Sequence, residues 1–182
     1  MIKTFKYFNN HRNLYCALGL TLVFILYISL VLVPLSGCFR LDIGSNSLGL
    51  SIYNIEIVQE FFHARDQAQL LCYSQFLQLW DIIFAVVSTV MNGSWIIYLF
   101  KSKRLLLVAP TVLGMIADWS ENFLELLMLK TYSNSGAISE TLVSLGSGLN
   151  IFKLTMSGLT WLIILVGIIL ALKTFLTKPK LT

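Results

Sequence analysis

The sequence predicts an all-α integral membrane protein, a bundle of four transmembrane helices with an amphipathic helix between the first two. Composition is the first reason, because 57% of the residues are hydrophobic and 12% are charged, whereas soluble domains carry about 25% charged residues. The second is the presence of four apolar stretches, each able to supply the roughly 20 helical residues that cross a bilayer. The third is the sorting of basic residues to one side of those stretches. Residues 1–182 are expected to form a single membrane domain.

The first two predicted spans are residues 14–35 and 78–100. The first is an uncharged run that follows a basic arm and ends near Pro34 and Gly37, residue types that interrupt or terminate helices. The second is uncharged in its C-terminal part, and its extension toward the N-terminus brings in Asp81 and several glutamines.

The third and fourth predicted spans are residues 105–129 and 149–172. Only the short basic turn 101–104 separates the third span from the second. These two spans are therefore expected to form an antiparallel helical hairpin. The fourth span carries one charge, Lys153, before a basic tail.

Basic residues determine the predicted orientation, since Lys and Arg accumulate on the cytoplasmic side of a membrane. Of the thirteen Lys and Arg residues, nine fall in the N-terminal arm, the 101–104 turn and the C-terminal tail, and none of the nine acidic residues does. Arg40, Arg65 and Lys130 fall on the other side. Both termini are therefore expected in the cytoplasm, and a bacterial inner (plasma) membrane is the expected location.

The connection between the first two spans, residues 36–69, is the largest predicted segment outside the bilayer. Its first part, 37–49, is rich in Gly, Ser and Asn and predicts an irregular loop. Its second part, 55–69, alternates apolar and charged residues near helical spacing. This pattern predicts an amphipathic helix that lies on the outer membrane face or leads directly into the second span. A short helix is also expected at 138–145, before the fourth span.

The three cysteines leave two alternatives open. The segment Leu35-Ser36-Gly37-Cys38 resembles the cleavage box of a bacterial lipoprotein. The apolar run before it is longer than the roughly 7–15 residues of a signal sequence, which favours retention of the first helix. Cys38 and Cys72 both fall near the predicted outer face, where an oxidising compartment would join them in a disulfide. Free, inert thiols are the favoured alternative.

The third predicted span carries a polar stripe, because its polar residues are spaced i, i+3, i+4 and i+7 and so share one helix face. They are Asp118, Glu121, Asn122 and Glu125. At a rise of about 1.5 Å per residue, the stripe lies in the outer half of a hydrocarbon core about 30 Å thick. Glu125 is the outermost member and is expected at the interface.

Asp81 and Lys153 are expected at a depth similar to that of this stripe. Ionised carboxylates in hydrocarbon are costly, so these groups should face the interior of the bundle and pair with one another. Lys153 is the natural counter-ion, and a pair with Asp81 would fix helix packing. Because one lysine cannot neutralise all the acids, a shared proton, a bound cation or Arg65 from the outer helix would balance the excess charge.

These polar residues have two interpretations. They either hold the helices together by hydrogen bonds and ion pairs or form a functional pocket, and four polar groups on one stripe favour the pocket. In that interpretation Asp118, Glu121 and Lys153 are the candidate catalytic residues. The candidate substrate-binding residues are Asp81, Asn122 and Arg65.

The order of these residues resembles a family of small uncharacterised bacterial four-helix integral membrane proteins with an intramembrane Asp-x-x-Glu-Asn motif. The matching positions are Arg65, Asp81, Asp118, Glu121, Asn122 and Lys153. The chain departs from the family's pattern at Ala68, where a tyrosine is expected, although Tyr73 follows about one turn later. The resemblance supports this choice of residues and implies no particular activity.

Motifs for other chemistries are missing from the sequence. It contains no phosphate-binding loop, paired-cysteine motif or Ser-His-Asp arrangement, and its two histidines, His11 and His63, are predicted on opposite sides of the membrane. No metal and no cofactor are therefore expected. The basic pI of about 9.0 is explained by inner-face lysines beside anionic lipid, so nucleic acid is not an expected partner.

The leading functional hypothesis is the binding, with or without conversion, of an amphiphilic or lipid-like small molecule from the membrane. In a conversion, a carboxyl group would act as general acid or base while Lys153 stabilises negative charge. One alternative is a proton- or cation-coupled transport subunit, which with four spans would need to form a homo-oligomer. The other is a structural or assembly subunit without a ligand.

Overall fold

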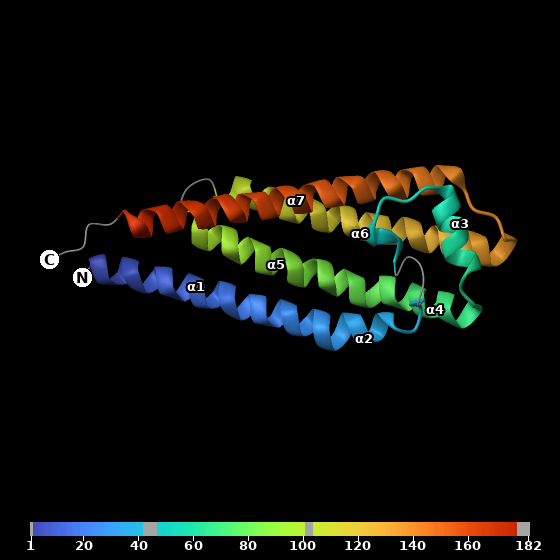
Figure 1. Cartoon of the computed structure of the whole chain (residues 1–182), viewed down its shortest axis with the longest axis horizontal. Coiled ribbons are helices and arrows are strands. Elements are labelled where there is room, and N and C mark those ends of the chain that lie inside the picture. Colours follow the sequence, from blue (N-terminus) through green and yellow to red (C-terminus); the bar gives the residue numbers. More distant parts are fainter. Residues whose placement is uncertain (1, 42–46, 101–103, 178–182) are drawn as a thin grey trace.

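The computed structural model describes residues 2–41, 47–100 and 104–177, the side chains of residues 2–10 and 175 excepted. Every regular element in this part of the chain is a helix (Figure 1). Residues 101–103 of the basic turn predicted at 101–104, and the tail lysines Lys178 and Lys180, lie outside the described residues.

The first long helix consists of α1 (Ile2–Tyr27), the π-helical turn η1 (Ile28–Leu32) and α2 (Val33–Ser36). Pro34 cannot donate to the carbonyl one turn back, and the wider π turn before it accommodates this missing hydrogen bond. The helix ends at Gly37 and covers the first predicted span.

Helix α3 (Ile55–His63) begins at Asn54, whose side-chain oxygen accepts a hydrogen bond from the Ile57 N–H at 3.0 Å. Its apolar face is spaced i, i+3 and i+4 and is buried among other protein side chains: Val58, Phe61 and Phe62. The amphipathic helix predicted over 55–69 therefore ends at His63, and its apolar face packs inside the protein instead of lying on a membrane surface.

The second long helix consists of α4 (Gln67–Gln75), the π-helical turn η3 (Phe76–Asp81) and α5 (Ile82–Leu99). Asp66 starts it with a capping box, in which its carboxylate accepts from the Gln69 N–H at 2.8 Å and the Gln69 side chain accepts from the Asp66 N–H at 3.0 Å. This cap makes the helix begin well before residue 78, the predicted start of the second span.

Helices α6 (Arg104–Ser135) and α7 (Glu140–Leu176) form an antiparallel pair. The turn between them contains Gly136 at φ +68°, a left-handed conformation that glycine adopts without a steric penalty. Ser139 then caps α7 by accepting from the Leu142 N–H at 3.4 Å. The separate short helix predicted at 138–145 is in fact the first part of α7.

Three helical stretches among the described residues are long and apolar enough to cross a membrane. They are His11–Ser36, Gln67–Leu99 and Glu140–Thr174. By length and composition the chain is therefore a membrane protein. Helix α6 is of comparable length, but its acidic stripe makes it less hydrophobic.

Helix α5 lies between α1 and α7, and α6 packs along α5 and α7 (Figure 1). The indole N–H of Trp95 on α5 donates to the Thr21 hydroxyl on α1 at 2.9 Å, and the rings of Phe24 and Phe84 stack 5.8 Å apart. Helix α1 begins and α7 ends at the same end of the molecule, which we call the terminal end. The opposite end, covered by η2 (Leu48–Leu50) and α3, is the capped end.

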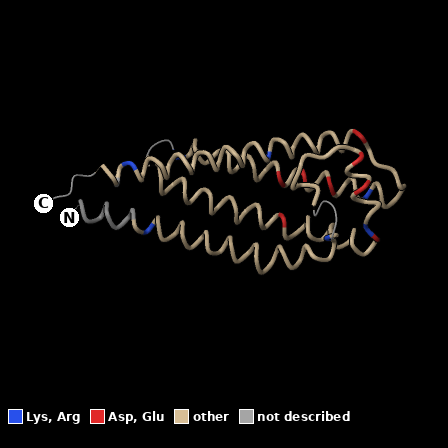
Figure 2. Tube along the Cα trace, viewed as in Figure 1, with Lys and Arg blue, Asp and Glu red and all other residues tan. Residues whose placement is uncertain are grey.

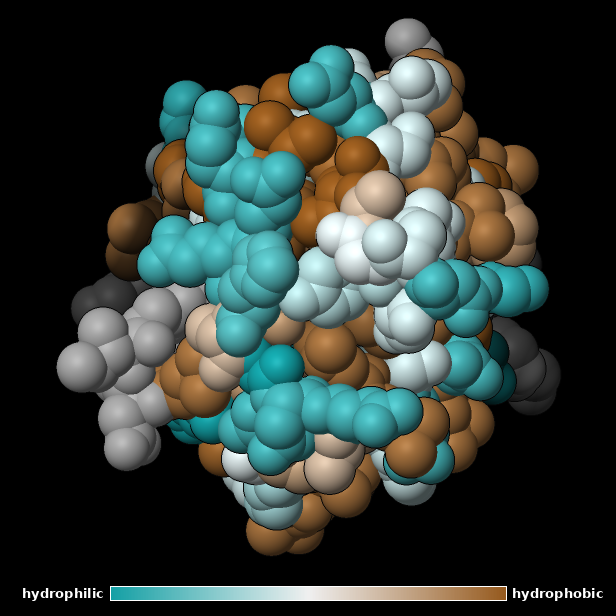
Figure 3. All heavy atoms as spheres, turned by 90° about the vertical axis from the view of Figure 1, so that its right-hand side faces the viewer, coloured by the Kyte–Doolittle hydropathy of each residue, from teal (hydrophilic) through white to brown (hydrophobic). Residues whose placement is uncertain are grey.

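Charged residues are distributed unequally between these ends. The acidic residues of the described part of the chain lie in the half of the molecule toward the capped end (Figure 2). A band of hydrophilic side chains also crosses the surface of that end (Figure 3). Its exposed charged residues include Glu56, Glu60, Asp66, Lys130 and Glu140.

The capped end contains the main hydrophobic core of the described residues. Its fully or nearly fully buried members include Phe39, Leu48, Tyr53, Phe62, Tyr73, Met128 and Val143. Because these side chains come from the loop before α3 and from α3, α4, α6 and α7, they fix the cap on the ends of the long helices.

A disulfide joins Cys38, just after α2, to Cys72 in α4, with 6.3 Å between their Cα atoms. The favoured interpretation of three free thiols is therefore wrong for this pair, while Cys16 is free and exposed. Since the Cys38 sulfur is bonded to Cys72, it is not the lipidated cysteine of a lipoprotein. The disulfide ties the end of the first long helix to the second.

Candidate functional site

The ammonium group of Lys153 on α7 is the centre of a polar cluster. Its Nζ lies 2.5 Å from Glu121 Oε2 and 3.2 Å from Asp118 Oδ1, both on α6. It also donates to the backbone carbonyl of Gly49 at 3.0 Å. An ammonium group has three hydrogens, so these three acceptors use its full donor capacity.

Asp81 and Asn122 form the second part of this cluster. The side-chain amide of Asn122 on α6 donates to Asp81 Oδ2, at the start of α5, at 2.8 Å. The expected pairing of Lys153 with Asp81 is therefore replaced by pairing with Asp118 and Glu121. Five of the six predicted site residues come together here, and we call them the polar cluster: Asp81, Asp118, Glu121, Asn122 and Lys153.

Arg65 is the sixth predicted site residue, and its described contacts lie in the cap. Its Nε donates to the Phe39 carbonyl and its Nη1 to the Phe61 carbonyl, each at 2.8 Å. The guanidinium carbon lies 3.5 Å from the centre of the Phe61 ring, a cation–π contact. Burial lowers the pKa of Arg65. These contacts fasten the start of the loop to α3, and Arg65 does not line the cavity beside the polar cluster.

Glu125 lies one turn beyond Glu121 and is completely buried, with an exposed fraction of 0%. Its Oε2 accepts a hydrogen bond from the hydroxyl of Tyr73 on α4. It therefore lies in the protein interior and not at the interface where the sequence placed it. Tyr73, the nearest match to the tyrosine of the resembled family, supplies this hydrogen bond.

The segment 47–51 covers the polar cluster from the capped end. Asn150 on α7 holds it by donating to the Ser51 carbonyl at 2.7 Å, and Leu48 is completely buried. A Cβ added at Gly49 would lie 3.1 Å from Lys153 Nζ, so glycine permits this close approach of the backbone. Periodicity does not reveal such a contact, because the loop and α7 are far apart in the sequence.

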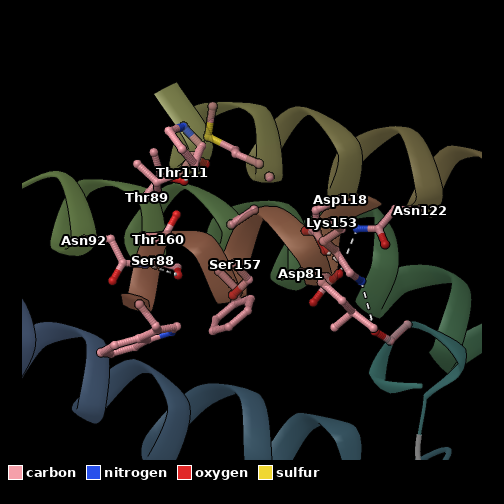
Figure 4. Close-up of a pocket in the computed structure, with 18 of the residues that line it drawn as sticks. Asp81, Ser88, Thr89, Asn92, Thr111, Asp118, Asn122, Lys153, Ser157 and Thr160 are labelled. Carbon is pink, nitrogen blue, oxygen red and sulfur yellow. Dashed lines mark hydrogen bonds and ion pairs between the residues drawn. The ribbon is translucent and has the colours of Figure 1, made fainter. Parts of the chain in front are cut away.

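A cavity of about 290 Å³ extends from the polar cluster toward the middle of the bundle (Figure 4). Its end at the polar cluster is lined by Asp81, Asp118, Asn122 and Lys153, whereas Glu121 lies behind Lys153 and does not line it. Apolar side chains supply much of the remaining lining: Phe24, Phe84, Met115, Leu154 and Trp161.

The other end of the cavity is lined by uncharged polar side chains, on the left of Figure 4. We call them the neutral polar group, and they are Ser88, Thr89, Asn92, Thr111 and Thr160. Sequence reasoning missed them because it followed the charged residues and the polar stripe of the third predicted span. A signal was present, since Asp81, Ala85, Ser88 and Asn92 follow one another at i, i+4, i+7 and i+11 and so share a face of α5.

Each end of the cavity has a buried oxygen without a hydrogen-bond partner among the described residues. These atoms are Oδ2 of Asp118 and Oδ1 of Asn92, whose residues are 8% and 6% exposed. Buried polar groups in proteins are nearly always hydrogen-bonded. These two acceptors on the walls of one cavity are therefore placed to accept hydrogen bonds from a molecule inside it.

The exposed lining residues show where the cavity meets the surroundings of the protein. Leu154 and Trp161 of α7 both line it and are 40% and 52% exposed. The outer surface of α7 around these two residues is otherwise apolar, so the cavity approaches an apolar helix surface here. Among the described residues, no three His, Cys, Asp or Glu side chains are placed to hold a metal ion.

The chemistry of the polar cluster is that of an acceptor-rich, acidic site. Asp118 is the one ion-pair partner of Lys153 that also reaches the cavity, so it is the group best placed to accept a proton or hydrogen bond from a bound molecule. Glu121 acts through Lys153, whose position it fixes. The resemblance to the four-helix family stays a prediction, because no family model, curated protein or solved structure matches the chain.

Proposed function

We propose that the protein binds a single amphiphilic small molecule taken from the membrane, with its polar head at Asp118 and Asp81 and its apolar part along the middle of the cavity. The observation that carries this proposal is the unpartnered, buried Asp118 oxygen on the wall of a largely apolar cavity. The opening beside Leu154 and Trp161 supports entry from the bilayer. A molecule that is partly apolar can follow this route without leaving the membrane.

The head group of this molecule is a hydrogen-bond donor, and a cationic amine fits best. Lys153 has no hydrogen left to offer a ligand, because Glu121, Asp118 and the Gly49 carbonyl accept all three. The cluster contains three carboxyl groups and one ammonium, and an excess of acid in a low-dielectric site favours a bound cation. A head group with only acceptors would find no free donor on Lys153.

The proposal includes a four-span topology with both termini in the cytoplasm. Helix α6 packs along two helices that can cross a membrane, and its charged face points inward while Ile116 and Phe123 are exposed. Because α1 begins and α7 ends at the same end, an even number of crossings fits the arrangement. The disulfide at the capped end favours an oxidising compartment there, and basic residues favour cytoplasm at the other end.

The test is to identify what copurifies with the protein, by mass spectrometry of extracts from wild-type protein and two variants on α6. Asp118→Asn keeps the size of the side chain and removes its charge, so we expect about tenfold less bound amphiphile, as the loss of a charge-assisted hydrogen bond predicts. Ser120→Ala is the control, because the Ser120 hydroxyl donates to its own helix at Ile116. Equal amounts of the same molecule in all three proteins would refute the proposal.

A further inference from the structure

The neutral polar group at the far end of the cavity has no role in the function proposed so far. Its members come from three helices, with Ser88, Thr89 and Asn92 on α5, Thr111 on α6 and Thr160 on α7. Asn92, Thr111 and Thr160 are at most 6% exposed. Polar side chains buried this deeply in a membrane bundle need hydrogen-bond partners. Those partners therefore indicate what these residues do.

A structural role in holding the helices together does not account for the neutral polar group. The Thr160 hydroxyl donates to Met156 of its own helix at 2.8 Å, and the Asn92 amide donates to Ser88 of its own helix at 3.4 Å. Within the described part of the chain, the hydrogen bond of this group that crosses between helices runs from the Thr89 hydroxyl to the Thr111 carbonyl, and it is long at 3.4 Å. Residues that join helices in membranes form hydrogen bonds across them. These side chains instead line the cavity, where the side-chain oxygen of Asn92 lacks a hydrogen-bond partner among the described residues.

The two polar ends of the cavity differ in charge and are separated by an apolar stretch. Asp81 and Asn92 are eleven positions apart on α5, which corresponds to about 16 Å along a helix. Lys153 and Thr160 are seven positions apart on α7, which corresponds to about 10 Å. Phe84 lies between Asp81 and Ser88 in the sequence and Met115 between Thr111 and Asp118, and both line the cavity between its ends. A molecule that satisfies both unpartnered oxygens must therefore carry polar groups at both ends of an apolar chain.

We propose that the ligand is a single-chain molecule with two polar ends, a cationic amine bound at Asp118 and an uncharged hydroxyl or amide bound by Asn92, Thr111 and Thr160. This inference rests on the proposed function and specifies its ligand. A cavity of about 290 Å³ is at the small end of ligand pockets and suits one chain. A two-chain lipid is too large, and an ordinary amphiphile with one polar end leaves Asn92 without a donor.

The test compares two probes that differ in one group: dodecylamine and its ω-hydroxy counterpart. Binding to the full-length protein in lipid nanodiscs is measured by calorimetry, for the wild type and for Asn92→Leu, Thr160→Val and Ser94→Ala. Each variant is compared with wild type for the same probe, so that partitioning of the probe into lipid cancels. Ser94→Ala is the control, because the Ser94 hydroxyl donates to its own helix and does not line the cavity.

We expect Asn92→Leu to bind the ω-hydroxy probe about fivefold more weakly than wild type does, the loss of one hydrogen bond. The affinity of Asn92→Leu for dodecylamine should be nearly unchanged, and Ser94→Ala should bind both probes as wild type does. Thr160→Val removes one hydroxyl of the neutral polar group with little change of shape. Its affinity for the ω-hydroxy probe therefore tests the same end of the cavity if Asn92→Leu fails to fold.

Two results would contradict the inference in different ways. If Asn92→Leu and Thr160→Val bind the ω-hydroxy probe as tightly as wild type does, the second polar end is refuted while the amphiphile site stands. If wild type binds neither probe, and Asp118→Asn copurifies with the same molecules as wild type, the proposed function itself is refuted together with the inference.

Discussion

At the scale of single residues, the geometry of the site depends on which three oxygen atoms the ammonium group of Lys153 contacts. Glu121 and Asp118 accept two of its hydrogens and the Gly49 carbonyl accepts the third. Glu121 has no exposed surface, so its charge depends on Lys153 for compensation. The pair is therefore a fixed structural unit that leaves Asp118 Oδ2 as the free acceptor on the cavity wall.

Replacing Lys153 with methionine should destabilise the protein by about 3–5 kcal/mol, because it leaves buried carboxylates without their counter-ion. Adding Glu121→Gln removes one of those carboxylates and should restore much of the loss. Unfolding free energies of the two single variants and the double variant in detergent give the interaction energy directly. Strictly additive effects would show that Lys153 and Glu121 do not depend on each other.

The sequence predicted most of this cluster but not its pairing. Helical spacing on α6 and equal depth on α5 and α7 were enough to bring Asp81, Asp118, Glu121, Asn122 and Lys153 together. Depth alone does not distinguish which carboxylate meets the lysine, since that depends on helix rotation and packing. The Gly49 carbonyl and the Tyr73 hydroxyl were missed because they reach the site from distant segments.

At the scale of elements, α6 is the helix on which both topology and site depend. It carries three of the five residues of the polar cluster and packs along α5 and α7. Its existence and approximate bounds follow from sequence, as do those of the other long helices. Their ends were predicted less well, because Asp66 and Ser139 start α4 and α7 earlier than the apolar runs suggest. The Cys38–Cys72 disulfide was the less favoured alternative, because spacing in the sequence does not determine pairing.

If α6 crosses the membrane, cysteines placed at its two ends should differ in accessibility. We expect a membrane-impermeant maleimide to label Asn134→Cys in intact cells and to label Arg104→Cys only after permeabilisation. Both positions are exposed at the surface of the protein, and a Cys16→Ala background removes the free cysteine. Labelling of both positions from the same side would contradict the four-span topology.

At the scale of the whole molecule, the protein is a bundle of long apolar helices with a folded cap at one end. The cap holds the buried core and its disulfide, and it covers the polar cluster from that side. The cavity below is open at α7, where Leu154 and Trp161 are exposed. Under the proposed function, this architecture closes the site toward the capped end and leaves it accessible from lipid, as a binding site for a membrane-borne molecule requires.

The central claim is that one elongated molecule occupies the cavity between Asp118 and Asn92. An experimental structure of the protein extracted from its membrane without detergent tests this most directly. The account predicts a single continuous density that runs along Phe84 and Trp161 and lies within hydrogen-bond distance of Asp118 Oδ2 and the Asn92 amide. A cavity that holds only ordered water, or that side chains have closed, would contradict it.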